Sequence, residues 1–263
     1  MITIQKYIRP QSLEEAYQLN QARNNRIVGG MLWVKTGSGN INTAIDLCDL
    51  GLNTIEETET EFSIGAMVSL RQIEQHEGLN AYSQYAIRDA VKDIVGVQFR
   101  NMATVGGSLW GRFGFSDVLT VFLCMDSYVE LFHGGILPLE EFAKQKYDSD
   151  LLVRLIVKKT PGTFTYSAMR AQRTDFPVLT CAVSNMGGVY RVSIGARPAR
   201  AIVTYDTENI LSGGITEETA AKMADYVAEH TPTGSNMRGS SEYRTHLTKV
   251  LTCRNLLRLG GLS

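Results

Sequence analysis

Residues 100–117 read RNMATVGGSLWGRFGFSD, and the central part of this stretch, residues 104–114, is rich in glycine. Directly after it, Ser116 and Asp117 fit the start of a helix through Leu123, because serine and aspartate are favoured at helix N-termini. The run Tyr128-Val129-Glu130-Leu131 then predicts a strand. The stretch therefore predicts a glycine-rich loop that leads into a helix and a strand.

A second diglycine, Gly29-Gly30, directly follows the predicted strand 26–28. Glycine lets a ligand approach the backbone where a Cβ atom would collide. Two such loops that face each other, one of them at Gly106-Gly107, could surround a diphosphate with main-chain N–H donors. An isolated glycine pair is more often a tight turn, and spacing alone leaves both interpretations open. The Walker and Rossmann patterns are absent around both pairs, which disfavours those two nucleotide-binding folds.

The first half of the chain alternates between helix and strand patterns. Ser12 and Glu15 predict a capped helix, and a strand is expected at residues 43–47. The acidic run 56–61 predicts a solvated turn before a strand at 62–64. Residues 69–95 predict two helices separated near Gly78.

The pattern changes past about residue 160. The β-rich runs 178–183 and 189–194 flank Asn185-Met186-Gly187-Gly188, which is typical of a hairpin. Two helices are expected afterwards, at residues 217–229 and 241–259.

The composition excludes several classes of function. The 263 residues are 44% hydrophobic and 20% charged, with 26 Lys and Arg against 27 Asp and Glu. This balance gives no reason to expect nucleic acid or an acidic membrane as a partner. No apolar run approaches the roughly 20 residues that span a bilayer, and the first residues lack the apolar core of a secretion signal. The expected location is cytoplasmic.

The cysteines and histidines give no pattern of a metal site. Cys48, Cys124, Cys181 and Cys253 are far apart in the sequence, and the four histidines are equally scattered. We expect buried, reduced thiols and no metal or iron–sulfur cluster held by this chain alone.

The segment that starts at Arg100 resembles the second flavin motif of the xanthine dehydrogenase and carbon monoxide dehydrogenase flavoprotein family. That motif runs R-N-x-A-T-V-G-G-N, then S-D, then L-L-A-L-D-A-x-V-E-L, and this chain has RNMATVGGS, Ser116-Asp117 and LCMDSYVEL. The sequence IVGG at 27–30 is similar to the first motif, A-G-G-T-D-L. Tyr166, Arg170, Arg173 and Asp175 resemble a third motif, and residues 238–254 resemble the closing helix. The order is collinear along nearly the whole chain.

The resemblance implies an α+β fold with two domains. Residues 1–160 would form a two-subdomain FAD-binding fold of the vanillyl-alcohol-oxidase (PCMH) type, with subdomains at about 1–55 and 56–160. Residues 161–263 would form a smaller α/β C-terminal domain of the CO dehydrogenase flavoprotein type.

The resemblance also implies a set of FAD-binding residues. The predicted set comprises Ile27, Val28, Gly29, Gly30, Met31, Leu32 and Trp33 in a first diphosphate-binding turn, Thr104, Val105, Gly106, Gly107 and Ser108 in a second, and Ile94, Gly111, Ser116, Asp117, Tyr166 and Asp175 elsewhere.

Three of these residues keep a second interpretation. Asp117 would accept a hydrogen bond from an FAD hydroxyl, which suits a carboxylate, but it also fits a helix start. Tyr166 lies either near the isoalloxazine ring or in the core. Asp175 is either a further polar contact or part of a turn or salt bridge.

The chain departs from the family in its glycine motifs. Met31 and Leu32 stand where the family has Thr or Ser and then Asp, so a hydroxyl contact to phosphate is lost while the main-chain donors remain. Ser108 replaces a frequent Asn. Residues 111–115 replace a stretch that often contains proline, so the loop over the flavin is expected to differ.

The function implied is that of an FAD-carrying electron-transfer subunit of an oxidoreductase. Substrate would react at a molybdopterin centre on a large subunit. Electrons would pass through [2Fe–2S] clusters on a small subunit to FAD, and then to NAD or another acceptor. No catalytic side chain is expected in this chain. The alternatives are a stand-alone flavin oxidase, for which about 100 residues after position 160 leave little substrate domain, and a degenerate structural subunit.

Overall fold

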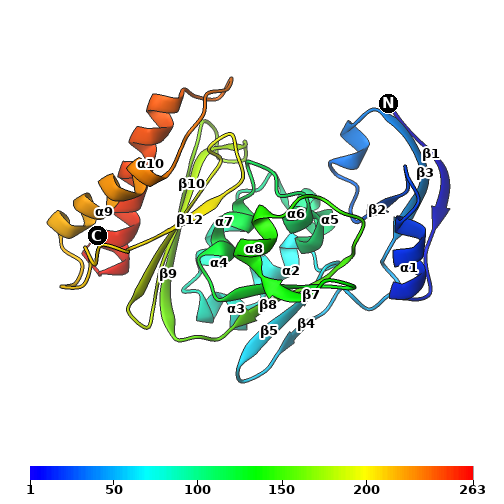
Figure 1. Ribbon diagram of the computed structural model, residues 1–263, viewed down its shortest axis with the longest axis horizontal. Coiled ribbons are helices and arrows are strands. Elements are labelled where there is room, and N and C mark those ends of the chain that lie inside the picture. Colours follow the sequence, from blue (N-terminus) through cyan, green and yellow to red (C-terminus); the bar gives the residue numbers. More distant parts are fainter. Residues whose placement is uncertain (263) are drawn as a thin grey trace.

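Three β-sheets follow one another along the chain in the computed structural model, which describes residues 1–262. Figure 1 shows the N-terminal sheet at one end, a central body of short helices on a second sheet, and a third sheet backed by two long helices at the other end. This arrangement agrees with the expected α+β fold.

The first sheet is parallel, with strand order β1-β3-β2. Its elements are β1 (Ile2–Ile8), α1 (Leu13–Asn20), β2 (Arg26–Val28), a 3₁₀ turn η1 (Val34–Thr36) and β3 (Gly39–Asp46). Ile27 on β2 pairs with Ile45 on β3, and Ala16 of α1 is fully buried beside that strand. β2 is an edge strand that ends at Val28, so Gly29 and Gly30 directly follow it at the edge of this sheet.

The second sheet is antiparallel, with strand order β4-β5-β8-β6-β7. Its strands are β4 (Ile55–Glu57), β5 (Glu61–Gly65), β6 (Ser127–Leu131), β7 (Gly135–Pro138) and β8 (Leu152–Lys158). The helices around it are α2 (Leu70–Gln75), α3 (Glu77–Tyr82), α4 (Ala86–Val91), α5 (Val97–Met102), α6 (Val105–Trp110), α7 (Asp117–Leu123) and α8 (Leu139–Lys144). Sheet and helices share one apolar core, to which Phe62, Phe122 and Leu155 contribute.

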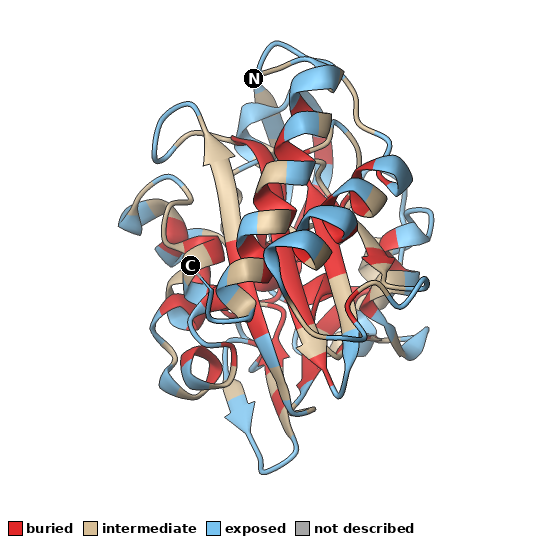
Figure 2. Ribbon diagram, turned by 90° about the vertical axis from the view of Figure 1, so that its left-hand side faces the viewer, coloured by how far each residue is buried: buried red, intermediate tan, exposed pale blue. Residues whose placement is uncertain are grey.

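The third sheet is also antiparallel, with strand order β12-β11-β10-β9. Its elements are β9 (Gly162–Arg170), β10 (Pro177–Met186), β11 (Val189–Gly195), β12 (Ile202–Tyr205), α9 (Glu217–His230) and α10 (Ser241–Leu259). The α10 helix packs against β9 and β10, while α7 lies against β10 and β11. Nearly every residue of β10 is buried, because the central body covers one face of this sheet and the helix pair covers the other. Figure 2 shows the helix pair in front of these buried strands.

Several local predictions were wrong. Gly78 lies inside α3, and the helical region 69–95 contains three helices that are separated at His76 and at residues 83–85. Residues 55–57 are strand β4, so the solvated turn is confined to the middle of the acidic run. Gly106 and Gly107 lie in α6 and not in a loop. The strands β1, β7, β8, β9 and β12 were not predicted.

Candidate FAD-binding site

A cavity of about 600 Å³ is lined by residues of the first sheet, the central helices and the β9–β10 loop. This volume lies within the roughly 300–1,000 Å³ that is usual for small-molecule and cofactor pockets. The sequence-predicted residues in the lining are Ile27, Gly29, Gly30, Met31, Leu32, Trp33, Ile94, Thr104, Gly106, Gly107, Ser108, Gly111, Ser116, Asp117 and Asp175. Val28, Val105 and Tyr166 are buried and do not line the cavity.

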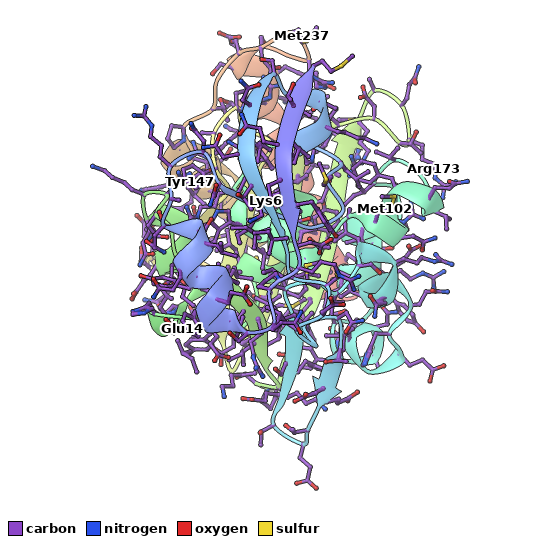
Figure 3. All side chains as sticks on the ribbon, turned by 90° about the vertical axis from the view of Figure 1, so that its right-hand side faces the viewer. Lys6, Glu14, Met102, Tyr147, Arg173 and Met237 are labelled. Atoms are coloured by element: carbon purple, nitrogen blue, oxygen red, sulfur yellow. The ribbon has the colours of Figure 1, made fainter. Side chains whose placement is uncertain are left out.

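The first diglycine is in direct contact with the segment that precedes the second one. A Cβ atom on Gly29 would lie 2.8 Å from the Thr104 hydroxyl oxygen, and a Cβ on Gly30 would collide with the carbonyl oxygen of Met102. Figure 3 shows Met102 near Arg173 on one side of the N-terminal sheet, and Tyr147 on the other side. The two motifs, more than 70 residues apart in the sequence, therefore form one wall of the cavity.

The first motif presents unpaired main-chain donors. The N–H groups of residues 30–33 find no hydrogen-bond acceptor within residues 1–262. Met31 takes a left-handed backbone conformation with φ of 58°. Successive N–H groups in such a turn form a concave site that attracts anions. The first motif can therefore bind a phosphate without a hydroxyl side chain.

The second motif has its donors occupied. The N–H of Gly106 donates to the Ala66 carbonyl at 2.8 Å, and the N–H of Gly107 donates to the Thr104 hydroxyl at 3.1 Å. A Cβ on Gly106 would lie 2.6 Å from that Ala66 oxygen. Glycine at this position therefore allows α6 to approach β5 closely, and the free donors of the wall come from the first motif.

Asp117 forms a buried polar cluster with two residues of β9. Ser116 caps α7 by accepting a hydrogen bond from the Leu119 N–H at 3.0 Å, which leaves Asp117 in the first turn of the helix. Its Oδ1 accepts hydrogen bonds from the Tyr166 hydroxyl and from Arg170 Nη2. Burial raises the pKa of the Asp117 carboxyl, and the Arg170 guanidinium opposes that shift. Oδ2 accepts no hydrogen bond from a side chain in the described chain, and Asp117 lines the cavity.

The other two residues with alternative interpretations are now located. Tyr166 is 3% exposed and belongs to the apolar core. It is connected to the cavity lining by the hydrogen bond that its hydroxyl donates to Asp117. Asp175 lines the cavity, accepts a hydrogen bond from its neighbour Phe176 at 2.7 Å, and lies 3.5 Å from Arg238. Its carbonyl oxygen accepts a hydrogen bond from Arg170 Nη1 at 2.6 Å. Asp175 thus belongs to a turn and an ion pair as well as to the cavity wall.

An aromatic cluster of four residues contributes to the cavity lining, and only Trp33 among them was predicted from the sequence. The ring centroid of Trp33 lies 5.9 Å from Phe113, 5.1 Å from Phe115 and 5.5 Å from Phe176. The four residues come from three loops that are distant in sequence. The phenylalanines immediately beside the predicted motifs were the available signal.

The buried pair of Arg100 and Glu74 supports the wall from behind. Arg100 Nε donates to Glu74 Oε2 at 2.7 Å, and Arg100 Nη1 donates to the carbonyl oxygen of Ile94 at 3.2 Å. Ile94 lines the cavity. Arg100, the first residue of the second motif, therefore holds the loop between α4 and α5 in position, a role that was not predicted.

The described residues contain neither a metal-binding cluster nor a helix that could span a membrane. Across residues 1–262, no three His, Cys, Asp or Glu side chains gather in a way that could hold a metal ion. Among the helices of this same part of the chain, none is long and apolar enough to cross a membrane.

Two family models together match almost the whole chain. Residues 2–160 match the FAD binding domain in molybdopterin dehydrogenase, and residues 164–259 match the CO dehydrogenase flavoprotein C-terminal domain. The cavity lies mainly within the first of these segments, and the β9–β10 loop contributes from the second.

Known proteins and solved structures resemble this chain over nearly its full length. The uncharacterized protein YgfM of Escherichia coli K12 is 26% identical over 254 residues, which is 94% of this chain and 93% of YgfM. Reconstituted CO dehydrogenase from Oligotropha carboxidovorans contains a chain with 21% identity and a TM-score of 0.87, with 99% of both chains covered. Quinoline 2-oxidoreductase from Pseudomonas putida 86 gives 20% identity and a TM-score of 0.85, with 99% and 98% covered. At these identities the two structures establish a shared fold.

Proposed function

Because the chain belongs to the family of FAD-binding subunits of molybdopterin dehydrogenases, we propose that it carries FAD within an oxidoreductase complex and relays electrons through it. A large molybdopterin subunit would oxidise the substrate, and a small [2Fe–2S] subunit would deliver the electrons. NAD or another carrier would accept them. The similarity in fold to chains of CO dehydrogenase and quinoline 2-oxidoreductase supports this assignment of partners.

The residues of the cavity fit the chemistry of FAD. A diphosphate needs several hydrogen-bond donors, and the free N–H groups of residues 30–33 offer them. They lie in the turn of Gly29 and Gly30, where a Cβ atom would collide with the neighbouring segment. The ribityl chain carries hydroxyl donors, and Oδ2 of Asp117 is an acceptor at the cavity. The planar ring system needs an apolar surface, and the aromatic cluster around Trp33 provides one.

Each residue group has a defined task in this proposal. The first diglycine turn binds the diphosphate and Asp117 orients the sugar chain. Arg170 fixes the Asp117 carboxylate by its ion pair, and the aromatic side chains exclude water from the ring. When bound, FAD accepts electrons singly and can release them as a pair, which joins one-electron and two-electron carriers. No side chain of this chain is needed as a general acid or base.

The observation that carries the proposal is the contact between the two glycine motifs over one cavity. Gly30 and Gly107 both line it, and the segment from Met102 to Thr104 joins them. The lining of this cavity offers a partner for each part of FAD. Unpaired N–H groups suit the diphosphate, the Asp117 carboxylate suits the hydroxyls, and aromatic rings suit the planar ring system.

The test is an absorption spectrum of the complex purified with its partner subunits. We expect flavin bands beside those of iron–sulfur clusters, and reduction of the flavin when the substrate of the large subunit is added. Turnover of a small alcohol or amine by the isolated chain would support the stand-alone oxidase instead. A colourless chain that binds its partners but cannot be reconstituted with FAD would support the structural subunit.

A further inference from the structure

The aromatic cluster of Trp33, Phe113, Phe115 and Phe176 has an open face. Phe113 and Phe115 are parallel within 4° at 5.2 Å, and Phe115 meets Phe176 edge-on at 4.8 Å. Rings at these separations leave no slot between them for another aromatic group. Trp33 is 40% exposed and also lines the cavity, so it presents a free indole surface to a ligand.

Three separate loops of the protein contribute residues to the cluster. Trp33 follows the first diglycine turn, Phe113 and Phe115 lie between α6 and α7, and Phe176 lies in the β9–β10 loop. The guanidinium of Arg238 stacks on the Phe176 ring at 4.7 Å and pairs with Asp175. An exposed tryptophan backed by fixed rings is a rigid stacking surface with little conformational entropy to lose.

From this geometry we infer that the isoalloxazine ring of the bound flavin stacks on the exposed face of Trp33. The inference rests on the proposed function and adds the residue that positions the ring. Phe115 is two positions from Asp117, the proposed hydrogen-bond acceptor for the ribityl chain, and both line the cavity. The isoalloxazine ring at the end of the ribityl chain therefore reaches the aromatic cluster. Adenine is then left to the polar part of the lining, to which Asn20, Asn25 and Asp148 contribute.

The order of groups favours the isoalloxazine ring over adenine. The turn with free N–H groups at residues 30–33 includes Trp33, and Asp117 lines the same cavity two residues after Phe115. Diphosphate, sugar chain and isoalloxazine ring can therefore be bound by neighbouring parts of this lining. Asn20 and Asn25 both donate side-chain hydrogen bonds to main-chain carbonyls, which leaves their amide oxygens to accept from the amino group of adenine. The asparagines and the aromatic cluster in the lining therefore offer different chemistry, which suits adenine and the isoalloxazine ring respectively.

The experiment compares Trp33→Ala and Trp33→Phe with the wild-type chain. FAD and ADP are the two probes, and affinity for each is measured together with the fluorescence of bound flavin. Stacking lost in Trp33→Ala should weaken FAD binding about tenfold or more while ADP binding stays unchanged. The emission of bound flavin should rise in both variants, because an indole in contact with a flavin quenches it. Trp33→Phe should retain most of the affinity.

A matched control is Tyr243→Ala on α10. Tyr243 has a similar exposure of 43% and does not line the cavity, so FAD binding and flavin emission should not change. Thermal unfolding of each variant establishes that it is folded.

Three results would overturn the inference. Loss of ADP affinity in Trp33→Ala would place adenine at the cluster, and unchanged FAD affinity and emission would show that no ring stacks on Trp33. Both results leave the proposed function standing. A folded wild-type chain that binds no FAD would overturn the proposed function and the inference together.

Discussion

The carbonyl oxygen of Met102 occupies the space that a side chain on Gly30 would need. Since Met102 ends α5 and Gly30 follows β2, this contact joins the N-terminal sheet to the central body at the wall of the cavity. The contact also explains why glycine, and not merely a flexible residue, is required at position 30.

Gly30→Ala should weaken FAD binding at least tenfold. The new Cβ meets a backbone atom that cannot move without shifting α5, so the turn and its free N–H groups must change position. Gly213→Ala is the control, because a Cβ there has no atom within 4 Å. Flavin-binding titrations of the two variants check this, and equal affinities would contradict the proposed role of the first diglycine.

Arg100→Met should lower the free energy of unfolding by about 3–5 kcal/mol, because it leaves Glu74 buried without its main partner. The double variant Glu74→Leu with Arg100→Met should recover much of this loss. Denaturant unfolding measures both. The exposed pair Lys222 and Glu218 is the control, and Lys222→Ala should change the free energy of unfolding far less than Arg100→Met does. Equal effects at the two pairs would contradict the structural role of Arg100.

The stability of the protein should fall between about pH 10 and pH 12. Burial, together with a hydrogen bond to Glu140, raises the pKa of Tyr205 from its ordinary 10.0 to about 12. The folded state holds this proton more tightly than the unfolded state, so the contribution is complete below pH 10 and is lost as the pH approaches 12. Tyr205→Phe should show a shallower decline in that window. A variant that declines as steeply as the wild type would refute this assignment.

Thiol reactivity should separate the four cysteines. Cys48 is exposed, so the expectation of buried thiols was wrong for this residue. Cys124 and Cys181 are buried, and burial raises the pKa of Cys181 to about 11. We expect a thiol reagent to label Cys48 first, Cys253 more slowly, and the buried pair only after denaturation. Mass spectrometry of the labelled peptides gives the order. Early labelling of Cys181 in the folded protein would contradict the burial described here.

The sequence predicted those parts of the fold that depend on local pattern. The helix at Ser116, the hairpin around Asn185 and the two C-terminal helices were confirmed, because caps, turn residues and apolar periodicity lie within each segment. β9 was not predicted, although it carries Tyr166 and Arg170. Its pairing with β10 is a tertiary interaction that local propensity does not reveal.

The candidate site was likewise predicted only where the signal is local in the sequence. The glycine motifs were found because their residue types are unusual, and the structure brings both to one cavity. The aromatic cluster could not be assembled from the sequence, since Trp33, Phe113 and Phe176 meet only in three dimensions. The partner of Arg100 was equally hidden, because Glu74 lies 26 positions away on a different helix.

The ion pair of Asp117 and Arg170 connects α7 of the FAD-binding segment to β9 of the C-terminal segment. Removal of the residues after about position 160 would leave the buried Asp117 carboxylate without the Arg170 guanidinium and the Tyr166 hydroxyl that donate hydrogen bonds to it. Residues 1–160 therefore lack part of the proposed cofactor site by themselves, since β9 supplies the two side chains that hold Asp117.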